Sequence, residues 1–146
     1  MVLTAPSPAI RVFLVEDSAP IRERIASLLA EIDGVLLIGH ADTAAAASAA
    51  ILSTRPDVVL LDIHLAEGSG IDVLQAVHTC LPAIVFIVVT NFASAPYREK
   101  CLAAGASHFI DKSTESAHIA PLLAALVATR HQLHPQHDNT NRSASC

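Results

Sequence analysis

Five short apolar runs alternate with stretches of helical character, and this alternation constrains the fold more than any other feature. The runs cover residues 10–15, 35–41, 58–61, 84–89 and 107–110. Nearly every position in them is apolar, as expected for strands that are buried on both faces of a parallel sheet. With short connections and right-handed crossovers, the sequence predicts an α/β fold with a doubly wound, five-stranded parallel sheet.

Helical patterns follow each of these runs. Residues 20–32 have apolar side chains spaced mainly by three and four, with Ser18 as the expected N-cap. Residues 43–52 are mostly alanine, with Asp42 as the expected cap. Further helices are expected at 71–79, at 95–104 with a stop at Gly105, and at 115–130, where Pro121 indicates a kink or a later start.

Length and composition favour one domain that is neither a membrane protein nor a nucleic-acid binder. The chain has 146 residues, of which 52 % are hydrophobic and 16 % charged. We expect a short tail at 1–9, the domain at 10–130 and a disordered polar tail at 131–146. The net charge is −5 without any cluster of Lys or Arg, and no unbroken apolar stretch exceeds seven residues. We therefore expect no direct contact with nucleic acid and no membrane insertion.

The cysteine pattern bears on the compartment. Cys80, Cys101 and Cys146 are scattered along the chain and form no CxxC spacing. We therefore expect neither a zinc site nor a disulfide framework, packing roles for Cys80 and Cys101, and a cytoplasmic location. The three histidines of the predicted C-terminal tail are expected to be solvated rather than to hold a metal.

Polar residues gather where the predicted strands end, which is where ligands bind in such sheets. Glu16 and Asp17 follow the first run, Asp62 the third and Thr90 the fourth, while Lys112 comes shortly after the fifth. Carboxylates this close repel one another, and with a few waters they suit Mg²⁺. The ammonium and the hydroxyl can hold a phosphoryl group, and a free carboxylate can act as the nucleophile that forms an acyl phosphate.

The same residues stand in short motifs spread over most of the chain. They are FLVEDS at 13–18, DVVLLD at 57–62, Gly70 eight positions after Asp62, VVT at 88–90, AGA at 104–106 and FIDK at 109–112. With these motifs, the chain resembles a response-regulator receiver domain of the two-component signalling family over about residues 10–130. The resemblance implies a flavodoxin-like (βα)5 fold with strand order 2-1-3-4-5.

The resemblance assigns an acceptor and a metal site. It implies that Asp62 is the phospho-acceptor and that the cofactor is Mg²⁺. The metal would be held by Glu16, Asp17, Asp62 and the backbone carbonyl of His64. We expect the side chain of His64 to be an ordinary exposed loop residue.

The resemblance also assigns residues that contact and read the phosphoryl group. Thr90 and Lys112 would contact it, Thr90 and Phe109 would form a switch, and Asn91 would lie at the site entrance. Three positions depart from the commonest family pattern: Ala66 and Ser113 stand where proline is frequent, and Asn91 where a small residue is usual. A cis bond after Lys112 is therefore not expected.

The function implied by the resemblance is a signalling switch rather than a metabolic enzyme. A single-domain response regulator takes a phosphoryl group onto its aspartate from the phosphohistidine of a sensor histidine kinase or phosphotransfer protein. It catalyses only that transfer and the later hydrolysis. Its output is contact with an unidentified downstream protein, with a homodimer as a further option.

Two other functions compete with this interpretation. Phosphatases with an aspartyl nucleophile generally carry a second aspartate two residues later, where this chain has His64. A flavodoxin-like cofactor binder would need a loop rich in Ser, Thr and Gly after the first strand. Residues 16–20 instead read EDSAP, and the two acids would repel a phosphate.

Overall fold

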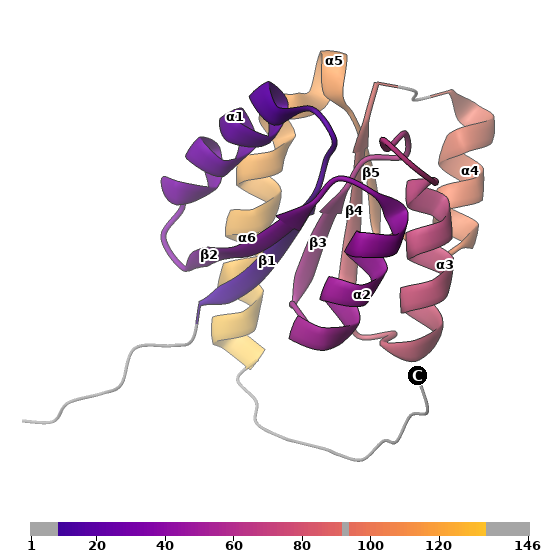
Figure 1. The fold of residues 1–146 in the computed structure, drawn as a ribbon. Coiled ribbons are helices and arrows are strands. Elements are labelled where there is room, and N and C mark those ends of the chain that lie inside the picture. Colours follow the sequence, from indigo (N-terminus) through magenta and orange to yellow (C-terminus); the bar gives the residue numbers. More distant parts are fainter. Residues whose placement is uncertain (1–8, 92–93, 134–146) are drawn as a thin grey trace, which may run out of the picture.

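The computed structural model describes residues 9–91 and 94–133, in which helices cover both faces of one sheet (Figure 1). All strand pairs are parallel, and the strand order is β2-β1-β3-β4-β5. The strands are β1 (Ile10–Val15), β2 (Val35–Ala41), β3 (Val58–Leu61), β4 (Val85–Thr90) and β5 (His108–Asp111). The predicted fold class and strand order are confirmed.

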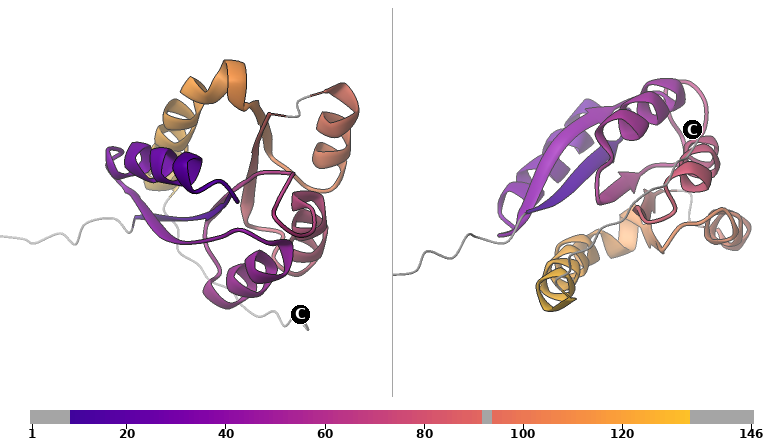
Figure 2. Two further views of the ribbon diagram at one scale, coloured as in Figure 1. Left: turned by 45° about the horizontal axis from the view of Figure 1, so that its top comes forward. Right: turned by 90° about the horizontal axis from the view of Figure 1, so that it is seen from below.

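Helices pack against the two faces of the sheet. They are α1 (Ala19–Ala30), α2 (Ala44–Thr54), α3 (Gly70–Cys80), α4 (Ala95–Ala103), α5 (Lys112–Glu115) and α6 (Ile119–Leu133), with the 3₁₀ turn η1 (Ser116–His118) before α6. One hydrophobic cluster joins the sheet to α2, α3 and α4, and a second joins it to α1 and α6. Figure 2 shows α2 and α6 on opposite sides of the sheet.

Successive strand residues point to opposite faces, so both clusters draw on every central strand. Phe86 of β4 belongs to the cluster under α2–α4, and its neighbour Ile87 to the cluster under α1 and α6. Both side chains are fully buried. Burial of such a side chain contributes about 1.5–3 kcal/mol, which explains why these strands have almost no polar positions.

Most predicted element boundaries agree with the structure within one or two residues. The predicted N-cap of α2, Asp42, is wrong. Thr43 caps this helix, because Thr43 Oγ1 accepts a hydrogen bond from the Ala46 N–H at 3.2 Å. The backbone carbonyl of Asp42 instead accepts from the Ala66 N–H at 3.2 Å. Asp42 therefore ties the start of α2 to the loop after β3.

The predicted helix at 115–130 begins and ends differently in the structure. α5 and η1 precede α6, and Pro121 is the third residue of α6, so the later start holds and no kink is needed. Proline is tolerated there because the first helical N–H groups have no partner within the helix. α6 continues to Leu133, past the predicted end, and most of both predicted tails lies outside the described residues.

The two cysteines in the described chain differ. Cys101 of α4 is fully buried and its thiol is free, as expected for a packing residue. Cys80 at the end of α3 takes part in a disulfide bond, so the expectation of a purely packing role is wrong. None of the described helices has both the length and the apolar character that crossing a bilayer requires.

Candidate functional site

The candidate site lies at the carboxyl edge of the sheet, where backbone hydrogen bonds continue past the strand ends. The Glu16 N–H donates to the Ala41 carbonyl and the Asp62 N–H to the Val15 carbonyl, both at 3.0 Å. Each acidic residue is therefore held by the neighbouring strand. Thr90 is the last residue of β4 and pairs with Asp111 of β5, so Lys112 begins at the same edge.

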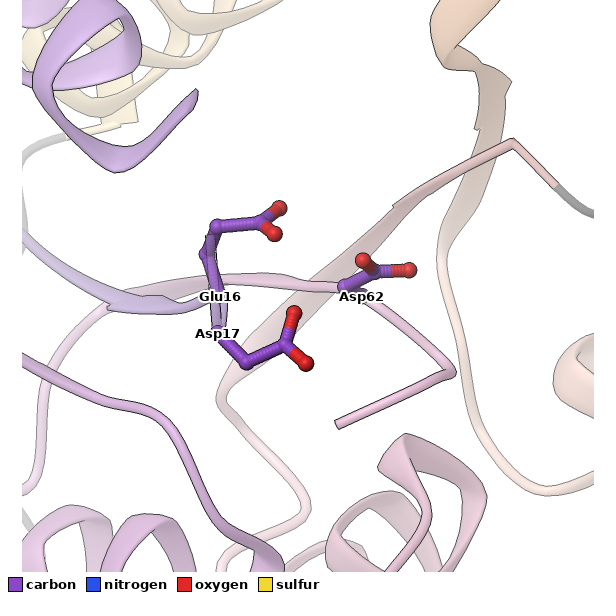
Figure 3. Close-up of side chains that lie close together, drawn as sticks. All are labelled: Glu16, Asp17 and Asp62. Atoms are coloured by element: carbon purple, nitrogen blue, oxygen red, sulfur yellow. The ribbon is translucent and has the colours of Figure 1, made fainter. Parts of the chain in front are cut away.

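Three carboxylates converge at this edge. Figure 3 shows the side chains of Glu16, Asp17 and Asp62 directed into one space. One oxygen from each lies within 4.8 Å of the others. Glu16 and Asp62 are only 2 % and 7 % exposed, whereas Asp17 is exposed. The structure thus brings together the three acids that the sequence singled out.

Lys112 bridges the two buried acids. Its Nζ donates to Glu16 Oε1 at 2.8 Å and to Asp62 Oδ2 at 3.2 Å. Burial raises the pKa of Glu16, and the nearby charge of Asp62 adds to this, although the bond to Lys112 opposes it. For Lys112, burial alone would lower the pKa, but the hydrogen bond to Glu16 and the charges of both acids together raise it. The raised pKa of Lys112 favours its ammonium form, which offsets negative charge on the acids around it.

The second carboxylate oxygen of Asp62 has no such partner. Asp62 Oδ1 is buried and makes no hydrogen bond with any described residue. A buried carboxylate oxygen without a partner is costly, and it is free to bind a ligand. Mg²⁺ is usually bound by hard oxygen donors from one or two carboxylates together with waters and phosphate oxygens, so the residues present fit this cation.

Glu16 is also held by residues that the sequence analysis did not assign. The Ser18 N–H donates to Glu16 Oε2 at 3.2 Å, and Ser18 is the N-cap of α1, as predicted. Arg22 Nη1 donates to the backbone carbonyl of Glu16 at 3.0 Å. Arg22 lies one helical turn after Ser18, which was the available signal, but spacing alone does not show where a long side chain turns.

His64 and Asn91 lie at the surface near the site. The His64 ring meets the Tyr97 ring of α4 edge-on, with 5.8 Å between centroids, and the residue is exposed. Asn91 is exposed and, with Lys112, lines a cavity of about 500 Å³ between α1 and the start of α6. The exposed side chain of His64 agrees with an ordinary loop histidine, and the role of Asn91 at the site entrance stays a prediction.

Comparison with known proteins gives the family. The pattern of the family described as "Response regulator receiver domain" matches residues 12–124. The chain belongs to this family. It is 28 % identical over 127 residues to the response regulator GacA of Pseudomonas viridiflava, covering 87 % of this chain and 59 % of that protein. It is 29 % identical over 111 residues to the DNA-binding transcriptional activator DevR/DosR of Mycobacterium tuberculosis, covering 76 % and 51 %.

Solved structures agree with this assignment. A LuxR-family two-component response regulator from Aurantimonas sp. has a TM-score of 0.77 at 26 % identity, covering 83 % of this chain and 86 % of that one. The receiver domain of the putative response regulator NarL from Mycobacterium tuberculosis has a TM-score of 0.75 at 27 % identity, covering 84 % and 99 %. The receiver domain thus accounts for the described chain, which spans only 51–59 % of the two relatives named above.

The two residues expected to form the switch of this receiver domain are both buried. Thr90 is fully buried, and Phe109 is 6 % exposed and opposite Val88 in the sheet register. The Phe109 ring packs in the α2–α4 cluster, and the guanidinium carbon of Arg98 lies 5.4 Å from its centroid. Arg98 was not assigned from the sequence. It connects α4 to the aromatic ring by a cation–π contact.

Proposed function

We propose that this receiver domain accepts a phosphoryl group on Asp62 and thereby switches a protein-interaction surface. The observation that carries the proposal is the Asp62 carboxylate: one oxygen bonds Lys112, and the other is buried and unpaired beside two more acids. A nucleophile needs one oxygen free, and a phosphoryl group needs cations around it.

The bonds that form and break in the transfer belong to the Asp62 carboxylate and the phosphorylated donor. An Asp62 oxygen attacks phosphorus, the bond from phosphorus to the donor nitrogen or oxygen breaks, and the donor leaves with that electron pair. Lys112 stabilises the charge on the transferred group, and the hydroxyl of Thr90 donates to one of its oxygens. Glu16, Asp17 and Asp62, with the His64 carbonyl, would hold Mg²⁺, which neutralises charge on the phosphoryl oxygens.

Mass spectrometry of the intact protein tests the acceptor. After incubation with acetyl phosphate and Mg²⁺, wild type is expected to gain the mass of one phosphoryl group, and Asp62→Asn is expected to gain none. Asp33→Asn is the matched control, because Asp33 is an exposed aspartate outside the site. Labelling of Asp62→Asn at the wild-type rate would falsify the assignment.

Removing the exposed carboxylate should weaken the metal site. Asp17→Asn keeps the shape of the side chain but removes a charged oxygen ligand. We expect Mg²⁺ affinity to fall by at least the roughly 10-fold that loss of an indirect metal contact costs. Without metal, the Tm should rise, because repulsion with Glu16 and Asp62 is relieved. Calorimetric titration with Mg²⁺ and thermal melts measure both, and equal Mg²⁺ affinity in the two proteins would remove Asp17 from the ligand set.

Thr90 and Phe109 would transmit the phosphorylated state. When the Thr90 hydroxyl moves to bond the phosphoryl group, it vacates space that Phe109 can fill, and the surface formed by α4, β5 and the following helix changes. In amide NMR with beryllofluoride, we expect shifts in wild type to spread from Asp62 to Phe109 and α4. In Thr90→Ala they should stay near Asp62. Equally wide shifts in both proteins would exclude Thr90 as the coupling element.

The partners follow from the same proposal. A sensor histidine kinase or phosphotransfer protein would supply the phosphoryl group, and the output would be contact with a downstream protein or a second copy of the chain. We propose a single-domain regulator that catalyses only its own phosphorylation and dephosphorylation. The cytoplasmic location expected from the sequence is part of the same proposal.

A phosphatase with an aspartyl nucleophile is the second candidate. It would need a general acid two residues after Asp62, and there the exposed His64 packs edge-on against Tyr97. Turnover of a small phosphate ester such as p-nitrophenyl phosphate would support the phosphatase, whereas a single round of labelling supports the switch.

A further inference from the structure

Lys112 carries much of the proposed chemistry, yet little secondary structure holds it. It is the first residue of α5, a helix of four residues that gives way at once to the 3₁₀ turn η1. Its side chain has four rotatable bonds and is only 11 % exposed. A lysine can hold a fixed ammonium position only if its backbone is fixed, so the bonds on either side of it matter.

Three residues, Asp111, Ser113 and Glu115, form a ring of hydrogen bonds around the backbone of Lys112. Asp111 Oδ1 accepts from the Ser113 N–H at 2.9 Å and from the Ser113 hydroxyl at 2.7 Å. In return, the Asp111 N–H donates to Glu115 Oε1 at 3.0 Å. The bonds start at Asp111 and end at Ser113 and Glu115, so they span Lys112 from both sides.

This arrangement is a reciprocal helix cap, but the helix that it caps is too short to explain it. Caps stabilise a helix by satisfying its first N–H groups. Here the helix ends at Glu115, which is itself part of the ring. The ring instead fixes the backbone at Lys112. The Nζ of this lysine donates hydrogen bonds to Glu16 and Asp62.

We propose that Asp111 and Glu115 are positioning residues for phosphoryl transfer, acting through Lys112. The proposal rests on the proposed function of Asp62 and Lys112, and it adds two carboxylates that do not touch the reacting atoms. Each contributes an acceptor oxygen: Asp111 to the Ser113 N–H and hydroxyl, and Glu115 to the Asp111 N–H. A neutral amide of the same shape should therefore replace either of them, because its carbonyl oxygen accepts the same hydrogen bonds.

The first experiment compares the rates of labelling by acetyl phosphate with Mg²⁺. A misplacement of about 1 Å can cost roughly 100-fold in rate, so we expect Glu115→Ala and Asp111→Ala to slow labelling by on the order of 10-fold. Glu115→Gln and Asp111→Asn should label at close to the wild-type rate. If the amide variants were as slow as the alanine variants, or if all four matched wild type, the positioning role would be overturned.

A double-mutant cycle separates action through Lys112 from a general loss of structure. In a Lys112→Ala background, the further change Glu115→Ala should have no added effect on the rate. An undiminished effect would contradict the proposal. If Lys112→Ala labels too slowly to follow, NMR of the lysine Cε–H groups decides. The chain has two lysines, Lys100 and Lys112, and only the Lys112 signal should shift in Glu115→Ala, with no shift in Glu115→Gln.

Failure of this proposal differs from failure of the proposed function. If wild type gained no phosphoryl group, or if Asp62→Asn gained one, the acceptor assignment would fail whatever Asp111 and Glu115 do. If Asp62 labelled normally and the ring variants behaved as wild type, only the positioning role would fail.

Discussion

Replacing Gly70 by alanine is expected to lower the free energy of unfolding by about 3 kcal/mol, at the upper end of the usual cost of overpacking. A Cβ at this position would overlap the carbonyl oxygen of Asp62 and would lie 2.9 Å from its carbonyl carbon and 3.0 Å from the Ile63 Cα. All three are backbone atoms of the loop that carries the acceptor, so no side-chain rotation relieves the overlap.

The position of Gly70 is held from both sides. Its N–H donates to the Ile63 carbonyl at 2.7 Å, and Ser69, the N-cap of α3, accepts from the Ile71 N–H at 3.1 Å. If the chain yields, the peptide after Asp62 must move, so labelling of Asp62 should slow as well. Urea denaturation and the labelling rate measure the two effects.

Gly39→Ala is the matched control for this change. A Cβ at Gly39 would lie 3.1 Å from the Phe13 ring, which is a side chain and can shift. We expect the free energy of unfolding to fall by less than about 1 kcal/mol, since a small overlap in a core is tolerated when neighbours can adjust. Phosphoryl labelling of Asp62 should proceed at the wild-type rate. If Gly70→Ala and Gly39→Ala lowered the free energy of unfolding equally, the close approach of Gly70 to the Asp62 backbone would carry no special cost.

The strands could be predicted well because their runs are apolar on both faces and bounded by turn residues. β1, β2 and β3 have the predicted bounds. β4 and β5 each start and end one residue later than predicted, because Thr90 and Asp111 are polar yet pair with each other in the register of the sheet. The sequence predicts that the polar Thr90 and Asp111 follow the strands. In the structure, the pairing of these two residues extends β4 and β5 to the site.

The convergence of the acids and the lysine could also be predicted, since parallel strands end at one edge. The contacts of Arg22, Arg98 and Glu115 could not, because each depends on where a long side chain turns after the backbone is in place. The close approach of Gly70 to Asp62 likewise joins a loop to a helix start. Motif spacing located Gly70, but only the structure gives the reason for it.

Lys112→Ala is expected to slow labelling of Asp62 by roughly 100-fold or more, the usual effect of removing a donor that stabilises a transition state. The variant should also be less stable by about 3 kcal/mol, because the buried carboxylates of Glu16 and Asp62 lose their cation. Mg²⁺ should stabilise the variant more than wild type, since a bound cation offsets more uncompensated negative charge there. Labelling rates and thermal melts with and without Mg²⁺ measure these three effects.

Lys100→Ala is the matched control, because Lys100 is an exposed lysine of α4 outside the site. It should change neither the labelling rate nor the response to Mg²⁺. The pattern expected for Lys112→Ala separates its two roles: Mg²⁺ restores stability, since any cation can balance the acids, but it does not restore the rate, which needs a donor to the phosphoryl group. If Mg²⁺ restored both, Lys112 would serve only as a counter-ion and Asp62 would need another donor.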